Sequence, residues 1–400
     1  MSHVAAAFFT RPWDSVDDTV MVSIDGVGEI QSATIHDSKF NLIDDWIAPK
    51  SVGLSYTMLT TLIGLRALED EYVVMGLSSY GKPIYAPWLI KWYDSIEQHW
   101  EPEFDGDIIN SPDNVRTHAD NELYAYLSSI IRQIDTNVDD DVRKYADLAA
   151  SMQKLAEHAM FEIMTEARKH GSKLVYGGGC AQNVVFNSML HEIFDEVHIA
   201  IAPTDAGSAL GCAALSWSKH TGKTRLPNFT PYLGYNIDRE IDVKEVVDHL
   251  MEHKVCGIAN GRAEFGPRAL GNRSLIADVR FDIKDTVNTI KRRQKYRPFA
   301  PAILEEHAAE YFEGEMNEYM QYTSIAKHDY SPVTHVDGTA RVQILKKDCP
   351  SIFRKIVEEY YARTGVPMLL NTSLNIRGRP MVNDEHDAEL WEQEYGVKVF

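Results

Sequence analysis

The sequence lacks the features that mark membrane, secreted and disulfide-rich proteins. It contains no run of about 18 apolar residues and no basic segment leading into an apolar stretch, so neither a membrane span nor a signal peptide is predicted. Its four cysteines show no CxxC spacing, which argues against a disulfide framework and against a zinc site made of cysteines. We therefore expect buried thiols in a reducing cytoplasm, and no membrane partner.

Positive charge is also scarce. The 400 residues include 40 lysines and arginines against 59 aspartates and glutamates, for a formal net charge of -19 at pH 7. This balance opposes broad binding to nucleic acids or anionic membranes, whose phosphates would be repelled. It leaves room for a small anion held in one basic pocket. The apolar fraction of 44% is ordinary for a globular chain of two or three domains.

The basic residues that are present gather in residues 260–301. Apolar residues such as Phe265 and Leu270 alternate with the cations there. A solvated basic helix face is the commoner explanation of such charges, but it would place them on one side. Arginine binds phosphate through two parallel hydrogen bonds, and glycine lets backbone N–H groups approach an anion. The stretch therefore predicts a partly buried anion site, with these cations as candidates: Arg262, Arg268, Arg273, Lys291, Arg292, Arg293, Lys295 and Arg297.

Near the N-terminus, residues 19–24 and 30–35 predict two strands on either side of the sequence DGVGE. This spacing predicts a tight hairpin whose glycines take positive φ. Most such hairpins are only turns, but ATP domains of the actin, hexokinase and Hsp70 type hold phosphate with the same arrangement. Under that second interpretation, Asp25, Gly26 and Gly28 are nucleotide-binding candidates.

Two later strand ends also point to ligands. Residues 174–176 predict a buried strand that runs into three glycines and then into a helix over residues 181–190. The positive end of a helix suits a nucleotide there. Asp205 opens the next predicted helix, either as an N-cap, the commoner role, or as a ligand aimed into the crevice at the strand ends. The nucleotide-binding candidates of this region are Gly178, Gly179, Asn183 and Asn187.

Three further segments, one polar and two rich in aromatic residues, could contribute to a ligand site. Residues 367–370 predict a buried strand, and the sequence NTSLN follows it. Such a polar run is usually a turn, but beside a cationic pocket its amides and hydroxyls could also bind a nucleotide. Residues 71–83 predict a segment leading into a loop. Residues 84–137 form an aromatic and acidic insertion with helical segments near 87–98 and 123–134, suited to a lid or to binding an acceptor.

Several separated segments agree, in order, with one known family. They are SHVAAAFF, SIDGVGE, EYVVMGLSSYGKP, YGGGCAQNVVFN, PTDAGSALGCA, GRAEFGPRALGNRS, KRRQKYRPFAPAIL, HVDGTARVQ and LLNTSLNIRGRPMV. Through them the chain resembles the NodU and CmcH family of O-carbamoyltransferases over almost its whole length.

The resemblance implies an α/β fold. An actin/Hsp70-like ATPase-type domain would occupy residues 1–225, a linker and connecting helix residues 226–254, and a YrdC-like α/β domain residues 255–400. The family's first strands, first phosphate loop and first metal-binding histidine would precede Met1, so we expect an N-terminally incomplete first domain. We expect half of a split enzyme completed by a separate polypeptide, a misplaced start, or a truncated form.

The resemblance also implies the chemistry. In the family, the YrdC-like domain makes carbamoyl adenylate from carbamoyl phosphate and ATP with Mg2+, and the first domain transfers the carbamoyl group to a hydroxyl at a metal and nucleotide site. His3 and Asp205 match the metal ligands, with Fe2+ suggested and other divalent ions compatible. Lys-x-Arg and Ser-x-Asn signatures fall on residues 291–293 and 373–375. The catalytic residues implied are Arg262, Arg268, Lys291, Arg293, Arg297, His335, Arg341, Ser373 and Asn375.

Two alternatives stay open. A threonylcarbamoyl-transfer relative acting on tRNA would use the same domain types, although the acidic charge and the fusion of both domains oppose it. A nucleotide-binding subunit of a split carbamoyltransferase would need a partner for catalysis. The residues leave the small-molecule hydroxyl acceptor undecided among a sugar, an antibiotic and a modified nucleotide.

Overall fold

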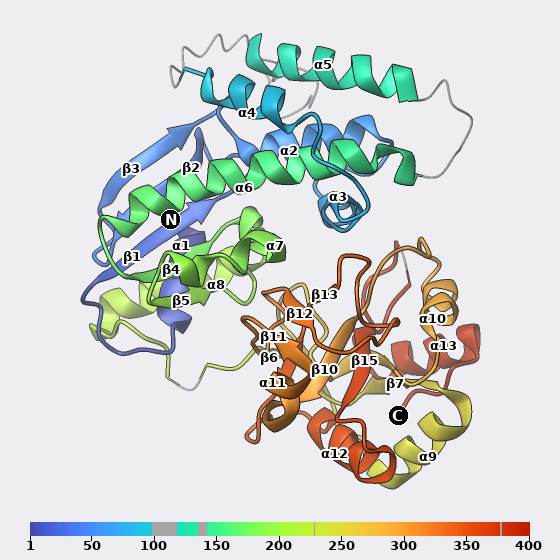
Figure 1. The fold of residues 1–400 in the computed structure, drawn as a ribbon. Helices are drawn as coiled ribbons and strands as arrows, with labels where there is room; N and C mark the ends of the chain where they lie inside the picture. Colours follow the sequence, from blue (N-terminus) through green and yellow to red (C-terminus); the bar gives the residue numbers. More distant parts are fainter. Residues whose placement is uncertain (98–117, 135–141, 228, 377) are drawn as a thin grey trace. The chain divides into compact units, whose positions relative to one another are not determined.

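A computed structural model describes residues 1–97, 118–134, 142–227, 229–376 and 378–400 (Figure 1). The chain divides into two compact units, Met1–Leu226 and Pro227–Phe400. Each unit combines helices with a mixed β-sheet, so the predicted α/β class is confirmed. None of the described helices is long and apolar enough to cross a membrane.

The first unit is built on a five-stranded sheet with the order β3-β2-β1-β4-β5. Strand β2 pairs antiparallel with β1 and β3, whereas β4 pairs parallel with β1 and β5. The strands are β1 Thr19–Ile24, β2 Gln31–Asp37, β3 Leu42–Ile47, β4 Lys173–Gly177 and β5 Glu196–Ile199. The helices are α1 Ser2–Thr10, α2 Val52–Leu62, α3 Glu71–Ser78, α4 Ala86–Asp94, α5 His118–Ile134, α6 Ala146–Arg168, α7 Val184–Asn187 and α8 Asp205–Thr221.

Helices cover both faces of this sheet, and every residue of β1 is therefore buried. On one face, Met21 and Val175 pack against Phe8 of α1. On the other face, the hydroxyl of Tyr176 lies 3.7 Å from the sulfur of Met160 in α6. A strand buried on both faces needs apolar residues at successive positions instead of alternating ones. The β-branched run at the start of the chain supplies them.

Two local expectations for this unit are wrong. Residues 71–78 form helix α3 instead of the start of a loop, because Val73, Val74 and Leu77 bury one side of a helical turn. The helix expected over residues 181–190 is broken into a 3-10 turn at Gly179–Gln182, the short α7 and a second 3-10 turn. The break occurs at Asn183, whose side chain accepts the Phe186 N–H and so begins a new helix.

The β1–β2 connection is also not the tight hairpin that the glycines predicted. The Asp25 N–H donates to the carbonyl of Ser32 at 2.8 Å and the Gly28 N–H to that of Gln31 at 2.7 Å, so residues 25–30 form a six-residue connection. Neither Gly26 nor Gly28 adopts a positive φ. The loop is held from outside, because Ser51 donates a 2.5 Å hydrogen bond to the carbonyl of Gly26.

The second unit has a five-stranded sheet with the order β14-β10-β15-β9-β7. Only β10 and β14 pair in parallel. These strands are β7 Val255–Ala259, β9 Arg273–Ala277, β10 Ala300–Leu304, β14 Gln343–Leu345 and β15 Met368–Ser373. Smaller sheets contain β6 Tyr232–Ile237 with β8 Gly261–Glu264, and β11 Phe312–Glu313 with β12 Ser324–Ala326 and β13 Thr339–Ala340. The helices are α9 Val243–His253, α10 Lys284–Ile290, α11 Ala308–Tyr311, α12 Phe353–Thr364 and α13 Glu385–Tyr395.

This second sheet also separates two apolar layers. Val247 of α9 and Tyr360 of α12 pack with Ile276 on one face. Leu275 and Trp391 of α13 belong to the cluster on the other face. Residues 226–254, expected as a linker and connecting helix, contain β6 and α9. The unit is thus a layered α/β structure with its own core.

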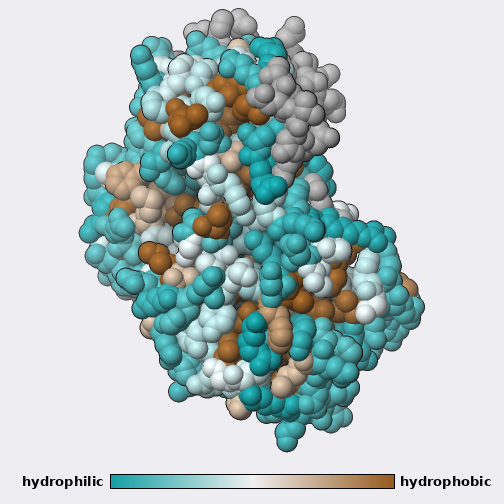
Figure 2. Space-filling model, turned by 45° about the vertical axis from the view of Figure 1, so that its right-hand side comes forward, coloured by the Kyte–Doolittle hydropathy of each residue, from teal (hydrophilic) through white to brown (hydrophobic). Residues whose placement is uncertain are grey.

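In the view of Figure 2 the surface is mainly hydrophilic, with separate hydrophobic areas. The expected lid over residues 84–137 lies partly outside the described residues, since residues 98–117 and 135–141 are not described. Its described parts are α4 and α5.

Candidate functional site

The first unit contains a cavity of about 310 Å³. Five predicted site residues line it, namely Asp25, Gly26, Gly179, Asn183 and Asp205. Helices α2 and α3 supply much of the remaining wall, including Gly53, Tyr56, Glu71, Tyr72 and Met75. The lining residues include the carboxylates of Asp25, Glu69, Glu71 and Asp205, and no lysine or arginine. Such a cavity attracts cations and repels free phosphates.

His3, the predicted metal ligand on α1, lies between two carboxylates beside this cavity. Its Nε2 atom lies 3.1 Å from Oδ2 of Asp25 and 3.4 Å from Oδ1 of Asp205. Its other ring nitrogen lies 3.4 Å from the hydroxyl of Ser208. Nε2 thus faces two anionic oxygens, and it can meet them either as an N–H donor or as a lone pair with a cation among the three atoms. The three side chains therefore offer one nitrogen and two oxygen donors to a divalent metal ion.

Asp25 is firmly held in its ionised form. Burial opposes ionisation, but hydrogen bonds from His3 and from the backbone N–H groups of Gly179 and Gly26 outweigh it, so the pKa of Asp25 lies below its usual value. The two backbone bonds measure 2.9 and 2.7 Å. Asp25, predicted as a nucleotide ligand, lines the cavity and also lies beside His3, the predicted metal ligand.

The glycine N–H groups that were predicted to meet phosphate are engaged inside the protein. The N–H of Gly26 donates to Asp25, and that of Gly28 donates to the carbonyl of Gln31 at 2.7 Å. Gly178 has φ +91, and a Cβ there would lie 2.3 Å from the carbonyl oxygen of Ile24. It therefore permits close packing of the strand ends and does not line the cavity.

The two predicted asparagines differ in position. Asn183 lines the cavity and exchanges two 3.1 Å hydrogen bonds with the amide of Gln153, which in turn accepts from the hydroxyl of Tyr56. Asn187 is fully buried and donates to the carbonyl of Ala181 at 2.9 Å. Asn183 is thus placed to meet a ligand, whereas Asn187 supports the loop after β4.

In the second unit the structure brings together Lys291, Ser373 and Asn375, which belong to the two signatures. The ammonium of Lys291 donates to the carbonyl oxygens of Ser373 and Asn375 at 2.5 and 3.0 Å. It also donates to the side-chain oxygens of both residues, at 3.3 and 3.0 Å. All four acceptors are neutral, so the buried charge of Lys291 has no carboxylate partner among the described residues. Burial, with Arg293 and Arg297 nearby, lowers the pKa of Lys291 well below its ordinary value.

Arg341 belongs to the same basic cluster. Burial and the proximity of Arg268, Arg293 and Arg297 lower the pKa of Arg341 well below its ordinary value. Its Nε atom is buried and has no hydrogen-bond partner in the described part of the chain. A buried donor without a partner costs free energy, and cations gathered this closely repel one another. An anion bound among them relieves both costs.

Three other predicted site residues make contacts apart from Lys291. Arg262 is exposed on β8 and donates to the carbonyls of Leu233 and Gly234 at 3.4 Å. Arg273 is fully buried and donates only to backbone carbonyls. His335 lies in the turn before β13, where its Nδ1 is 3.6 Å from Asp337.

Comparison with known proteins identifies the family. One family model, described as Carbamoyltransferase N-terminus, matches residues 1–214, and another, described as Carbamoyltransferase C-terminus, matches residues 247–399. The chain belongs to the carbamoyltransferase family. This confirms the resemblance inferred from the sequence segments, and the protein is a carbamoyltransferase enzyme.

Several relatives cover much of this carbamoyltransferase. Nodulation protein NolO of Bradyrhizobium diazoefficiens is 31% identical over 426 residues, which cover 96% of this chain and 74% of the relative. Nodulation protein NolNO of Sinorhizobium fredii is 32% identical over 428 residues, or 96% of this chain and 60% of the relative. Nodulation protein U of the same species is 34% identical over 257 residues, or 58% of this chain and 46% of the relative.

Sequence reasoning missed part of the cavity wall of this carbamoyltransferase. Glu71 and Met75 lie one turn apart on α3 and line the cavity, but their segment was expected to lead into a loop. Their spacing of four residues was an available signal. Gln153, which does not line the cavity but hydrogen-bonds to Asn183, was overlooked because a buried amide in an apolar helix looks like core.

Proposed function

We propose that this carbamoyltransferase makes carbamoyl adenylate from ATP and carbamoyl phosphate in residues 255–400. Residues 1–225 then transfer the carbamoyl group to a hydroxyl of a small molecule. The mixed sheet order β3-β2-β1-β4-β5 supports an actin/Hsp70-like ATPase-type fold for the first part. The clustering of Lys291 with Ser373 and Asn375 supports a YrdC-like fold for the second.

The observation that carries this proposal is the buried cation cluster around Arg341. Adenylate formation brings a triphosphate and a second anion together, so it needs fixed cations that face the phosphates. Lys291 and Arg341 supply charge that no described carboxylate neutralises. The cavity of the first unit lacks lysine and arginine in its lining, so we assign the ATP reaction to the second unit.

The proposed reaction proceeds in three steps. Water cleaves carbamoyl phosphate to carbamate and phosphate. A carbamate oxygen then attacks the α-phosphorus of ATP, and pyrophosphate leaves with Mg2+. In the first unit the acceptor hydroxyl attacks the carbamoyl carbon, AMP leaves, and the hydroxyl proton passes to a base or to solvent.

The first unit has residues that fit a divalent metal for this transfer. His3, Asp25 and Asp205 would hold it, with Fe2+ suggested by the family and other divalent ions compatible with the donors. When bound, such an ion supplies a Lewis acid. Asp25 and Asp205 also offer carboxylates beside the cavity that accept a proton from a hydroxyl. Asn183, oriented by Gln153, offers an amide for orienting the substrate.

The experiment that tests the proposal measures pyrophosphate release by the purified chain with ATP, Mg2+ and carbamoyl phosphate, and detects carbamoyl adenylate by mass spectrometry. We expect release that depends on carbamoyl phosphate and that Arg341→Met abolishes. Arg363→Gln is the matched control, since Arg363 lies on α12 and pairs with Glu359 at 2.7 Å. No release from a folded wild-type chain would contradict the proposal and favour the nucleotide-binding subunit.

A further inference from the structure

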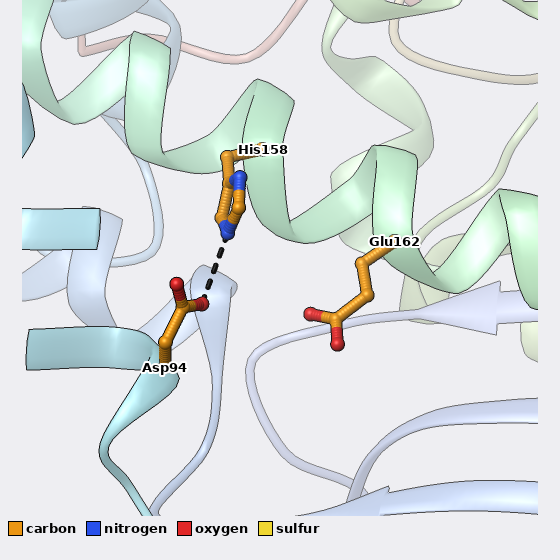
Figure 3. Close-up of side chains that lie close together, drawn as sticks. All are labelled: Asp94, His158 and Glu162. Atoms are coloured by element: carbon orange, nitrogen blue, oxygen red, sulfur yellow. Dashed lines mark hydrogen bonds and ion pairs between the residues drawn. The ribbon is translucent and has the colours of Figure 1, made fainter. Parts of the chain in front are cut away.

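Three side chains that commonly bind metals meet outside the cavity. Asp94 ends α4, and His158 and Glu162 lie on α6 (Figure 3). The Nε2 atom of His158 lies 2.9 Å from Oδ1 of Asp94, and the ligand atoms of the three residues all lie within 4.8 Å of one another. Ala156 and Met160 of the same helix line the cavity. Because His158 is two positions from each, it faces the opposite side of α6.

The two helices hold these side chains in place. His158 and Glu162 are four positions apart and extend from one side of α6, as Figure 3 shows. Helix α6 is 23 residues long. Asp94 follows Trp92 and Tyr93, which are buried and anchor the end of α4. The cluster therefore joins two packed helices and does not depend on a loop.

The charges of the cluster are poorly balanced without a cation. Two carboxylates share the space with one imidazole, and in the described part of the chain neither Asp94 nor Glu162 pairs with a lysine or arginine. Asp94 also lies in the last turn of α4, where the backbone carbonyl oxygens oppose a negative side chain. A cation among the three side chains would relieve both repulsions.

We propose that Asp94, His158 and Glu162 form a second metal site, which binds a divalent transition-metal ion such as Zn2+. An imidazole nitrogen and two carboxylate oxygens are ligands of this class of ion. Ligands bound at about 2.1 Å lie roughly 3.4 Å apart around a tetrahedral ion; His158 and Asp94 are 2.9 Å apart here, and all three ligand atoms lie within 4.8 Å. The ion joins α4 to α6 and stabilises their packing without entering the cavity.

The test measures zinc uptake by the full chain after removal of metals with a chelator. It is run in an Asp205→Asn background, so that zinc beside His3 contributes little. We expect His158→Ala to bind one equivalent less than its parent, and Glu162→Gln to bind zinc roughly tenfold or more weakly. Glu162 is exposed, so its substitution leaves the fold intact.

The matched control is His170→Ala. His170 and Glu166 are also four positions apart, with Nε2 and Oε1 3.8 Å apart. Within the described residues, no third ligand joins this pair. The control should therefore bind as much zinc as its parent. Equal uptake by the parent, His158→Ala and Glu162→Gln would overturn the proposal.

A second measurement separates a metal site from a simple ion pair. Zinc should raise the thermal midpoint of the parent but not that of Glu162→Gln. An ion pair between His158 and Asp94 alone, with no metal bound, would leave both midpoints unchanged by zinc. A parent midpoint that does not respond to zinc at pH 7.5 would also contradict the proposal.

Discussion

The cavity of residues 1–226 collects carboxylates, whereas residues 227–400 bury cations. In the first unit Asp25 and Asp205 flank a single imidazole, and the cavity lining holds no lysine or arginine. In the second unit Lys291 bonds only to neutral oxygens, and Arg341 lies near three other arginines. Each arrangement places like charges close together, which raises the electrostatic free energy. A bound ligand of opposite charge would lower that free energy.

This difference indicates two chemically distinct steps. A metal ion suits the first unit, and phosphates suit the second. The anionic substrates that we propose are compatible with the strongly acidic composition of the chain, because its buried cations are concentrated in one cluster. Variants that remove charge from one unit should therefore affect one step and spare the other.

The largest effect is expected for Lys291→Met. The substitution keeps most of the apolar volume and removes the buried ammonium, so pyrophosphate release should fall at least about 10³-fold. Steady-state pyrophosphate assays check this. Lys295→Met is the control, because Lys295 is exposed and lies 3.5 Å from Asp285. Release that persists in Lys291→Met would remove this lysine from the adenylating site.

Asp205→Asn should separate the two steps. It removes one carboxylate beside His3, so carbamoyl transfer to an acceptor should fall roughly 10²-fold while carbamoyl adenylate still forms. Mass spectrometry of both products checks this outcome. Asp195→Asn is a suitable control on the same unit, since Asp195 is exposed and lies 3.8 Å from Arg168. Equal loss of both steps would contradict the division of chemistry between the units.

The sequence predicts the regular parts of this fold well. Residues 19–24 form a strand as predicted, and the strand predicted over residues 174–176 lies within β4. Prediction failed where a side chain overrides the local pattern. Asn183 breaks an expected helix by capping a new one, and Ser51 donates a hydrogen bond to Gly26 in the loop that was expected to be a tight hairpin.

The candidate site was predictable only in part. The contacts of Lys291 with Ser373 and Asn375 follow from the sequence signatures, although the residues lie far apart in the chain. The position of Asp25 beside His3 depends on how α1 packs against β1 and β4, which no local pattern reveals. The sequence also gives no sign that the N–H of Gly28 is used inside its own loop.

The pH dependence of stability should distinguish the second unit. Burial and the nearby arginines place the folded pKa of Lys291 well below its unfolded value. Between these two values the unfolded chain binds one more proton, so stability rises with pH, by up to about 1.4 kcal/mol per pH unit, and levels off near the unfolded pKa. Urea unfolding between pH 7 and 10 checks this. The difference between the wild type and Lys291→Met isolates the lysine, and identical slopes would contradict its unusual environment.

The smallest effect is expected for Ser51→Ala. Ser51 accepts the Leu54 N–H at 3.1 Å as the N-cap of α2 and donates to the carbonyl of Gly26 beside the cavity. Its removal should cost about 1 kcal/mol of unfolding free energy. Ser129→Ala is the control, because Ser129 bonds only within its own helix, to the carbonyl of Tyr126. Since Ser51→Ala changes no charge, carbamoyl transfer should fall only a few-fold. If it falls as far as in Asp205→Asn, the shape of the cavity outweighs its charge, and the contrast between the two units does not explain the chemistry.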